Sequence, residues 1–215
     1  MKIILTSEFH KVADKLLGQW HLSPVKTKVA FIQNATDTRQ DRGEIITWVE
    51  DAKERYSNNG FTLDIIDLRI IQYKDLRSKL SEYKYLHIHG GDNKHLHAVC
   101  KQSWLTEIIH ELLDNGLIYI GSSAWSIIAW PDMNYSIATS TNYQSWLSKE
   151  EVGSINFKWF WLHPFYLIPH AGKADRLPVV LERVKYCEEQ KLSPLITYND
   201  QQAIIIENGK FELIW

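Results

Sequence analysis

The sequence predicts an α/β protein built on a mostly parallel sheet. Short apolar runs typical of strands alternate with amphipathic helical patterns, and several runs are continuously apolar, as in a sheet covered on both faces. This alternation favours parallel strands joined by helices, with ligands bound at the carboxyl ends of the strands. The expected strands are residues 2–6, 28–33, 61–68, 83–89 and 117–121.

The spacing of apolar residues also predicts the helices. In residues 103–114 the apolar positions follow the i, i+3, i+4, i+7 rhythm of one buried stripe. Residues 42–57 show a similar pattern, with Ile45 and Ile46 near its start. A further helix is expected over about 174–190, followed by closing strands.

Composition indicates a single domain spanning residues 1–215, because 45% hydrophobic residues are enough to bury one core. The net charge of -2 offers no basic stripe for phosphate backbones, so nucleic acid is not an expected partner. No stretch reaches the about 18 apolar residues of a membrane span, and the opening MKIILTSEF is too short for a signal peptide. The two distant cysteines, Cys100 and Cys187, favour a reducing, cytoplasmic location.

Two loops at expected strand ends have the residues of an acyl-transfer site. In GLIYIGSSAW, residues 116–125, an apolar run ends in Gly121 and brings Ser123 to the turn into an amphipathic segment. That is the place of a nucleophile elbow, in which the next backbone N–H, from Ala124, helps to bind the oxyanion. The other loop, residues 89–93, has a Gly-Gly pair that lets backbone N–H groups face a ligand. An ordinary tight turn is the alternative for both loops.

Three segments together resemble one family, the serine peptidases of the dipeptidase E and cyanophycinase type. They are HGGDN at 89–93, YIGSSA at 119–124 and YLIPH at 166–170, in matching order and spacing. The resemblance implies a three-layer α/β sandwich, flavodoxin-like and similar to class I glutamine amidotransferases. It also implies a peptidase without a cofactor that cleaves short peptides, often with an N-terminal aspartate.

The resemblance assigns roles by position. Ser123 matches the nucleophile and His170 the general base, a pairing that the chemistry requires because a serine at its free pKa is a poor nucleophile. The backbone oxyanion region is expected at Gly91, Asp92 and Ala124, with Asn93 and Trp125 in the substrate pocket.

The third member of the triad is not at the family position, because residues 137–143 contain no carboxylate. The candidates nearby are Asp132, Glu150 and Glu151, and the two glutamates rank first because some relatives look as if they use glutamate. Asp200, at a later strand end, could approach the site, but a turn is the preferred interpretation there.

Two departures from the family pattern motivate an alternative function. Trp125 stands where the elbow's closing glycine is usual, and the aromatic stretch 158–162 precedes the histidine. Trp125 is expected either as a wall of the substrate pocket or as a core residue. The alternative is a catalytically impaired relative that binds a small ligand or a protein.

A metal-dependent hydrolase is the third hypothesis. It rests on four histidines around the glycine turn, His87, His89, His95 and His97. No cysteine or carboxylate completes a recognised ligand spacing, so neither a metal nor another cofactor is expected. The expected partner is a small peptide, with a homodimer as an open alternative.

Overall fold

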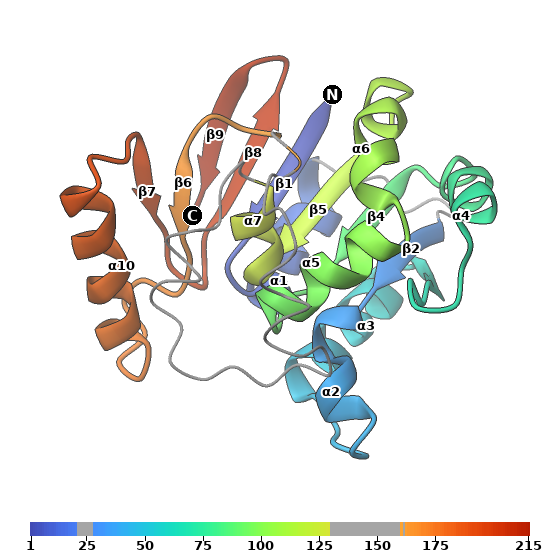
Figure 1. The fold of residues 1–215 in the computed structure, drawn as a ribbon, viewed down its shortest axis with the longest axis horizontal. Coiled ribbons are helices and arrows are strands. Elements are labelled where there is room, and N and C mark those ends of the chain that lie inside the picture. The colour runs from blue at the N-terminus through green and yellow to red at the C-terminus, as the bar shows by residue number, and fades with distance from the viewer. Residues whose placement is uncertain (21–27, 130–159, 161) are drawn as a thin grey trace.

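The structure, a computed structural model, describes residues 1–20, 28–129, 160 and 162–215. Its main sheet has seven strands in the order β3-β2-β4-β5-β1-β8-β9, and helices lie on both of its faces (Figure 1). The expected α/β sandwich with a mostly parallel sheet is therefore confirmed. Within the described residues, no helix is both long enough and apolar enough to cross a membrane.

Most strands of the main sheet pair in parallel. The parallel strands are β1 (Lys2–Thr6), β2 (Lys28–Ile32), β3 (Thr62–Ile65), β4 (Tyr85–Ile88) and β5 (Ile118–Ser122). Two strands run antiparallel along one side, β8 (Ala203–Glu207) beside β1 and β9 (Lys210–Ile214) beside β8. A separate parallel pair consists of β6 (Tyr166–Ile168) and β7 (Leu195–Thr197).

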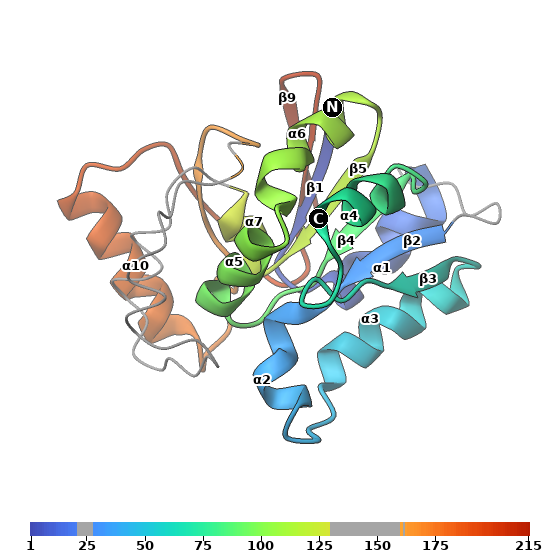
Figure 2. The same cartoon turned by 45° about the vertical axis from the view of Figure 1, so that its right-hand side comes forward.

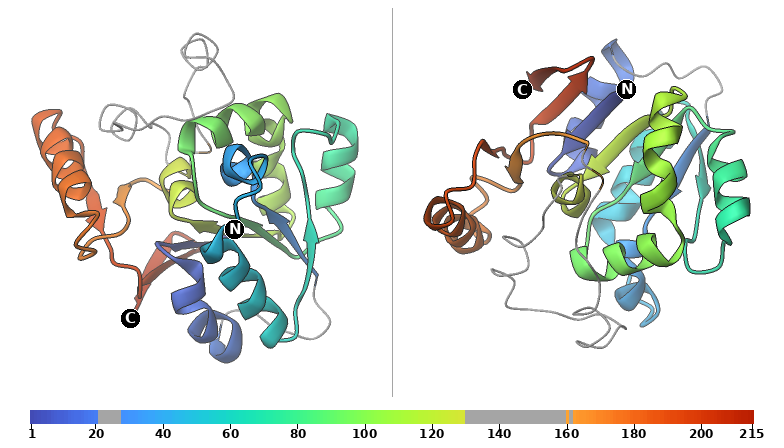
Figure 3. Two further views of the ribbon diagram at one scale, coloured as in Figure 1. Left: turned by 90° about the horizontal axis from the view of Figure 1, so that it is seen from below. Right: turned by 45° about the horizontal axis from the view of Figure 1, so that its top comes forward.

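Helices cover the two faces of the main sheet (Figure 2). One face packs against α1 (Phe9–Lys15), the π-helix η1 (Leu16–Trp20) and α3 (Thr47–Asn58). The other packs against α4 (Tyr73–Leu80), α5 (Asn93–Gln102), α6 (Leu105–Asp114) and α7 (Ala124–Ile128). The short η2 (Asn34–Thr36) and α2 (Asp37–Gln40) follow β2. Figures 1 and 3 place α10 (Leu177–Glu189), β6 and β7 beyond the β8–β9 end of the sheet.

Alternation along β1 explains why its sequence is continuously apolar. Ile3 and Leu5 point into the core beneath α5 and α6, and Ile4 points into the opposite core beneath α1 and α3. All three side chains are fully buried. A central strand covered on both faces has no solvent side, so it has no place for polar residues.

The expected elements agree with the structure, apart from their ends. One clear difference is the helix expected from residue 42, which begins at Thr47. The preceding residues form a turn in which Glu44 accepts hydrogen bonds from the Arg39 and Arg42 side chains. Ile45 is 81% exposed in this turn, whereas Ile46 is buried in the core.

Trp125 is a core residue, which corrects its expected place in the substrate pocket. Its side chain is fully buried and stacks on Phe160 with ring centroids 5.2 Å apart. It also contacts the Tyr119 ring beneath the first turn of α7. The first turn of this helix therefore faces the sheet at residue 125, and the indole fills space between the sheet and Phe160.

The sheet brings several chain segments to one edge. The carboxyl ends of β1, β4 and β5 meet there, since Thr6 lies opposite Ser122 and Ile88 lies opposite Gly121. Because β8 is antiparallel, it contributes its amino end, with Ala203 opposite Thr6. Residues that follow β1, β4 and β5, and residues that precede β8, are consequently neighbours.

We expect Trp125→Ala to lower the free energy of unfolding by about 3–5 kcal/mol, because it removes a fully buried aromatic side chain and leaves a cavity. Urea denaturation followed by circular dichroism measures the change. Trp215→Ala is the matched control, because Trp215 is 74% exposed and its loss should change stability by less than about 0.5 kcal/mol. Equal effects of the two substitutions would contradict the assignment of Trp125 to the core.

Candidate active site

Ser123 lies on a strained turn between β5 and α7. Its backbone has φ 52° and ψ −106°, a region that non-glycine residues seldom occupy. The Ser123 N–H donates to the Thr6 carbonyl oxygen at 2.8 Å. The Ser126 hydroxyl lies within 3.0 Å of the Thr6 and Gly121 carbonyl oxygens. These bonds hold the turn against β1 and present the Ser123 hydroxyl at the sheet edge.

Gly121 is required by the close approach of α7 to β5. A Cβ atom at this position would lie 2.9 Å from Cε1 of Tyr119 and 3.0 Å from the carbonyl oxygen of Trp125. That same carbonyl oxygen accepts the Tyr119 hydroxyl at 3.0 Å. The first glycine of the Gly-x-Ser pattern therefore has a steric cause in this fold.

His170 contacts the serine directly. Its Nε2 lies 2.9 Å from Ser123 Oγ, and its side chain is mostly buried. The residue follows β6 and has φ 66°, in the left-handed region. The N–H of His170 donates to Ser7 Oγ at 2.8 Å, which fixes the backbone at this position.

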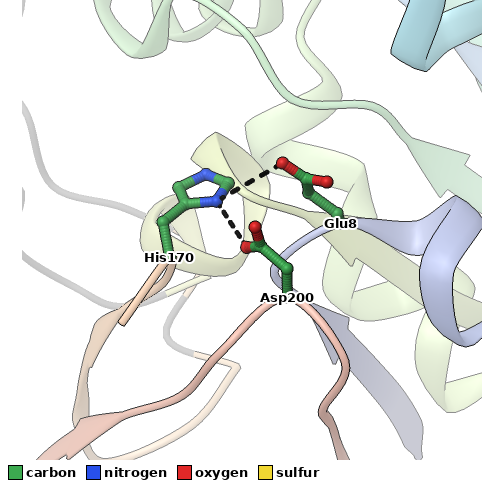
Figure 4. A group of neighbouring side chains, drawn as sticks. All are labelled: Glu8, His170 and Asp200. Carbon is green, nitrogen blue, oxygen red and sulfur yellow. Dashed lines mark hydrogen bonds and ion pairs between the residues drawn. The ribbon is translucent and has the colours of Figure 1, made fainter. Parts of the chain in front are cut away.

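Asp200 lies on the other side of the imidazole. Its Oδ1 is 2.7 Å from His170 Nδ1, so Ser123, His170 and Asp200 form one continuous hydrogen-bonded chain. Figure 4 shows the carboxylates of Asp200 and Glu8 pointing toward the ring. Glu8 is farther away, with Oε1 at 3.9 Å from Nδ1.

The strand pair β6–β7 explains why the histidine and the aspartate meet. Ile168 lies opposite Thr197 in this parallel pair, so the residues that follow both strands leave from the same end. The pairing continues past the strands, because the Ala171 N–H donates to the Tyr198 carbonyl oxygen at 3.1 Å. His170 and Asp200 both lie within three residues of these strand ends.

The sequence did not identify Asp200 as the partner of His170. Asp200 does lie in a turn, as expected, and its carboxylate points from that turn to the imidazole. The expected acids Glu150 and Glu151, and the candidate Asp132, lie outside the described residues. One feature of the sequence could have pointed to Asp200, because it comes just before the apolar run of β8. This feature locates Asp200 at the site only if β8 is known to run antiparallel to β1.

Two lysines surround the carboxylates of the site. Lys11 Nζ lies 2.7 Å from Glu8 Oε2 and 3.5 Å from Asp200 Oδ2. Lys173 Nζ lies 2.7 Å from Glu8 Oε1 and 3.8 Å from Asp200 Oδ2. Each carboxylate lies near both ammonium groups, so the positive and negative charges of this partly buried cluster compensate each other.

Hydrogen bonds keep Asp200 ionised. Burial alone would raise the pKa of this carboxyl group, but hydrogen bonds from His170 and Ser7 outweigh burial and hold the pKa of Asp200 far below its usual value. In Glu8 the same competition has the same result, because hydrogen bonds from Lys11 and Lys173 lower its pKa. Both carboxylates are therefore charged at neutral pH.

The same residues have the spacing of a metal site. The ligand atoms of Glu8, His170 and Asp200 all lie within 4.8 Å of one another. Lys11 and Lys173 already neutralise the carboxylates, and His170 Nδ1 is bonded to Asp200. A cation here would have to displace two ammonium groups, so the donor set fits proton transfer better than metal binding.

The four histidines expected around the glycine turn do not form one ligand cluster, because their side chains have different partners. His87 bonds to the Tyr56 hydroxyl at 3.0 Å and to Ser122 Oγ at 2.9 Å. His95 Nε2 lies 3.0 Å from Asp37 Oδ2. His89 lines the cavity, and burial lowers its pKa to about 4. Within the described residues, the group at metal-ligand spacing is the one around His170, which does not include these histidines.

Gly91 is fitted to its place in the loop after β4. A Cβ atom there would lie 2.4 Å from the Ala35 carbonyl oxygen, so another residue would force the loop to move. The Asp92 N–H donates to the same oxygen at 2.8 Å. The Asp92 carboxylate accepts hydrogen bonds from the N–H groups of Lys94 and His95 and caps α5. This corrects the expected oxyanion role of the Asp92 amide, which is already bonded.

A cavity of about 240 Å³ opens over Ser123 and His170. Gly91, Asn93, Trp48 and His89 line one part of it, so Asn93 lines the same cavity as Ser123. Another part is lined by α10 and the residues just before it, including Lys173, Arg176, Val180 and Arg183. The serine is therefore accessible to a small molecule with both polar and apolar groups.

Comparison with known proteins identifies the family of this chain. The model of peptidase family S51 matches residues 3–214. An uncharacterized peptidase of Pasteurella multocida is 24% identical over 209 residues, 96% of this chain and 94% of the relative. An uncharacterized peptidase of Listeria monocytogenes is 23% identical over 205 residues, 95% and 93% of the two chains.

Solved structures share the fold. A crystal structure from Listeria monocytogenes EGD-e, provisionally named a peptidase E, superposes with a TM-score of 0.82 at 21% identity, covering 99% of this chain and 97% of the other. A peptidase from an acI-B1 actinobacterium superposes with a TM-score of 0.65 at 14% identity, covering 99% and 86%. The chain belongs to peptidase family S51, and it is a serine-type peptidase of the dipeptidase E type.

Proposed function

We propose that Ser123, His170 and Asp200 are the catalytic triad of this peptidase, and that it cleaves short peptides. The observation that carries the proposal is the unbroken contact chain from Ser123 Oγ through both nitrogens of His170 to Asp200, at a strained elbow that faces a cavity. A serine needs such a base, and the base needs a third group to orient it.

In the proposed mechanism, Ser123 Oγ attacks the peptide carbonyl carbon while His170 Nε2 takes the hydroxyl proton. Asp200 holds the Nδ1–H and stabilises the imidazolium that forms. The tetrahedral intermediate collapses when His170 returns the proton to the leaving amine. Water, activated by the same nitrogen, then hydrolyses the acyl-enzyme and restores Ser123.

The backbone supplies the oxyanion donors in this mechanism. Ala124 is the first residue of α7, and its N–H is one of those that have no partner inside a helix. Gly91 lines the same cavity as Ser123 and contributes the second N–H. Both come from strand ends of the rigid sheet, so they need no rearrangement as charge develops on the carbonyl oxygen.

Two of the reasons for expecting a catalytically impaired relative are weakened by the positions of Trp125 and Asp200; residues 158, 159 and 161 of the aromatic stretch lie outside the described residues. Trp125 is buried away from the cavity, so its indole does not block the elbow. A carboxylate does contact the imidazole, although it comes from residue 200. The arrangement of groups therefore favours catalysis over a role in binding alone.

The cavity favours a short substrate that bears a carboxylate. Its volume of about 240 Å³ is too small for a folded chain. Arg176 and Arg183 lie on the α10 side of the cavity and would attract a negative charge. Short peptides with an N-terminal aspartate, expected from the family resemblance, are small enough for this cavity and carry a carboxylate.

We expect a fluorophosphonate probe to label wild-type protein at Ser123, and we expect no label in Ser123→Ala or His170→Ala. The first change removes the nucleophile, and the second removes the base that activates it. Mass spectrometry of the digested protein locates the label. Ser57→Ala, at an exposed position on α3, should label like wild type. Label on another residue, or undiminished label in His170→Ala, would refute the proposed pair.

We expect Asp200→Asn to lower kcat by about 10⁴-fold, because an amide neither fixes the Nδ1–H tautomer nor stabilises the imidazolium. Glu150→Gln and Glu151→Gln are the comparison variants, and each should retain kcat within about threefold of wild type. Steady-state kinetics with one dipeptide measures all three. A large loss in either glutamate variant, with activity kept in Asp200→Asn, would assign the acid to that glutamate.

We expect Arg183→Gln or Arg176→Gln to raise KM for an N-terminal aspartyl dipeptide by about tenfold, the size of one charge-assisted hydrogen bond. KM for the matching alanyl dipeptide should change far less. Arg42→Gln is the control, because Arg42 pairs with Glu44 before α3 and does not line the cavity. If KM for the two dipeptides changes equally in both cavity variants, the preference for a carboxylate is wrong.

A further inference from the structure

We propose that Ser7 is a positioning residue, which sets the orientation and the tautomer of His170 by binding both His170 and Asp200. This inference rests on the proposed triad. Ser7 follows the last residue of β1, and it is 1% exposed. Its hydroxyl contacts both the histidine and the aspartate, and Ser7 lines the same cavity as Ser123 and His170.

The Ser7 hydroxyl makes three short contacts. Its oxygen lies 2.5 Å from Asp200 Oδ1, 2.8 Å from the His170 backbone nitrogen and 3.1 Å from His170 Nδ1. The His170 N–H can only donate, so Ser7 accepts there. Ionised Asp200 can only accept, so Ser7 donates there. A single hydroxyl therefore fixes both residues relative to each other.

These assignments determine where the imidazole proton lies. The hydroxyl has one proton, and Asp200 receives it, so Ser7 has none left to give to His170 Nδ1. His170 Nδ1 lies 2.7 Å from Asp200 Oδ1 and must supply the proton for that contact. In the neutral imidazole Nε2 is then the unprotonated nitrogen, and it faces Ser123 Oγ as an acceptor, which is the tautomer that a general base needs.

The position of Ser7 directly after β1 couples the histidine–aspartate pair to the nucleophile. The preceding residue, Thr6, accepts the Ser123 N–H through its carbonyl oxygen. Thr6, the last residue of β1, thus holds the nucleophile, and Ser7, the next residue, holds the histidine–aspartate pair. Lys11 and Lys173 face the other oxygen of Asp200, so the Oδ1 contacts depend on Ser7 and His170.

The test compares Ser7→Ala with Ser7→Thr, which keeps the hydroxyl, and with Ser103→Ala. Ser103 is a matched control because it is 3% exposed and its hydroxyl donates to the Cys100 carbonyl oxygen, away from the site. We expect Ser7→Ala to lower kcat by about 10- to 100-fold, as the loss of an outer hydrogen-bond partner does, with KM within about twofold. Ser7→Thr should lie between Ser7→Ala and wild type, and Ser103→Ala should retain kcat.

A proton NMR spectrum gives a readout that does not need turnover. The Nδ1–H of His170, bonded to Asp200, should give a low-field resonance that is absent in His170→Gln. We expect this resonance to shift or broaden in Ser7→Ala and to stay in place in Ser103→Ala. Unchanged kcat and an unchanged resonance in Ser7→Ala would overturn the role of Ser7. If wild type lacks peptidase activity and the resonance still responds to Ser7→Ala, the proposed function fails while the positioning role stands.

Discussion

Strand β1 is bonded to parallel β5 on one side and to antiparallel β8 on the other, and the whole site depends on this change of direction. The parallel neighbour contributes its carboxyl end, with Ser123. The antiparallel neighbour contributes its amino end, with Asp200 in the turn just before it. Both reach the same edge of the sheet, where β1 ends at Thr6 and is followed by Ser7.

The site combines strained backbone with dense hydrogen bonding. Ser123 and His170 both have positive φ, which costs free energy for residues with a side chain. Each is held by the end of β1, since Ser123 donates to the Thr6 carbonyl oxygen and His170 donates to Ser7 Oγ. These bonds keep the reacting groups in one arrangement before substrate arrives.

Local signals were sufficient for much of this structure. Apolar runs identified the five parallel strands, and the Gly-x-Ser pattern placed Ser123 on a strand-to-helix turn. The role of Asp200 could not be predicted in the same way, because it depends on the direction of β8 and on the pairing of β6 with β7. These are contacts between distant segments, and apolar periodicity carries no information about them.

The pocket role expected for Trp125 and the oxyanion role expected for the Asp92 amide failed for a related reason. Position in the chain placed both beside the nucleophile, but packing decides which way a side chain or an amide points. The Trp125 indole turns into the core against Phe160. The Asp92 amide turns to the Ala35 carbonyl oxygen. Neither partner is close in sequence, so neither contact could be expected from the motif.

The most direct test of this account is a crystal structure of the protein after reaction with a phosphonate inhibitor. The account predicts a covalent bond from Ser123 Oγ to phosphorus and a phosphonyl oxygen between the N–H groups of Gly91 and Ala124. It also predicts that His170 lies between the modified serine and Asp200. A structure in which His170 bonds instead to Glu150 or Glu151, with Asp200 turned away, would contradict the central claim.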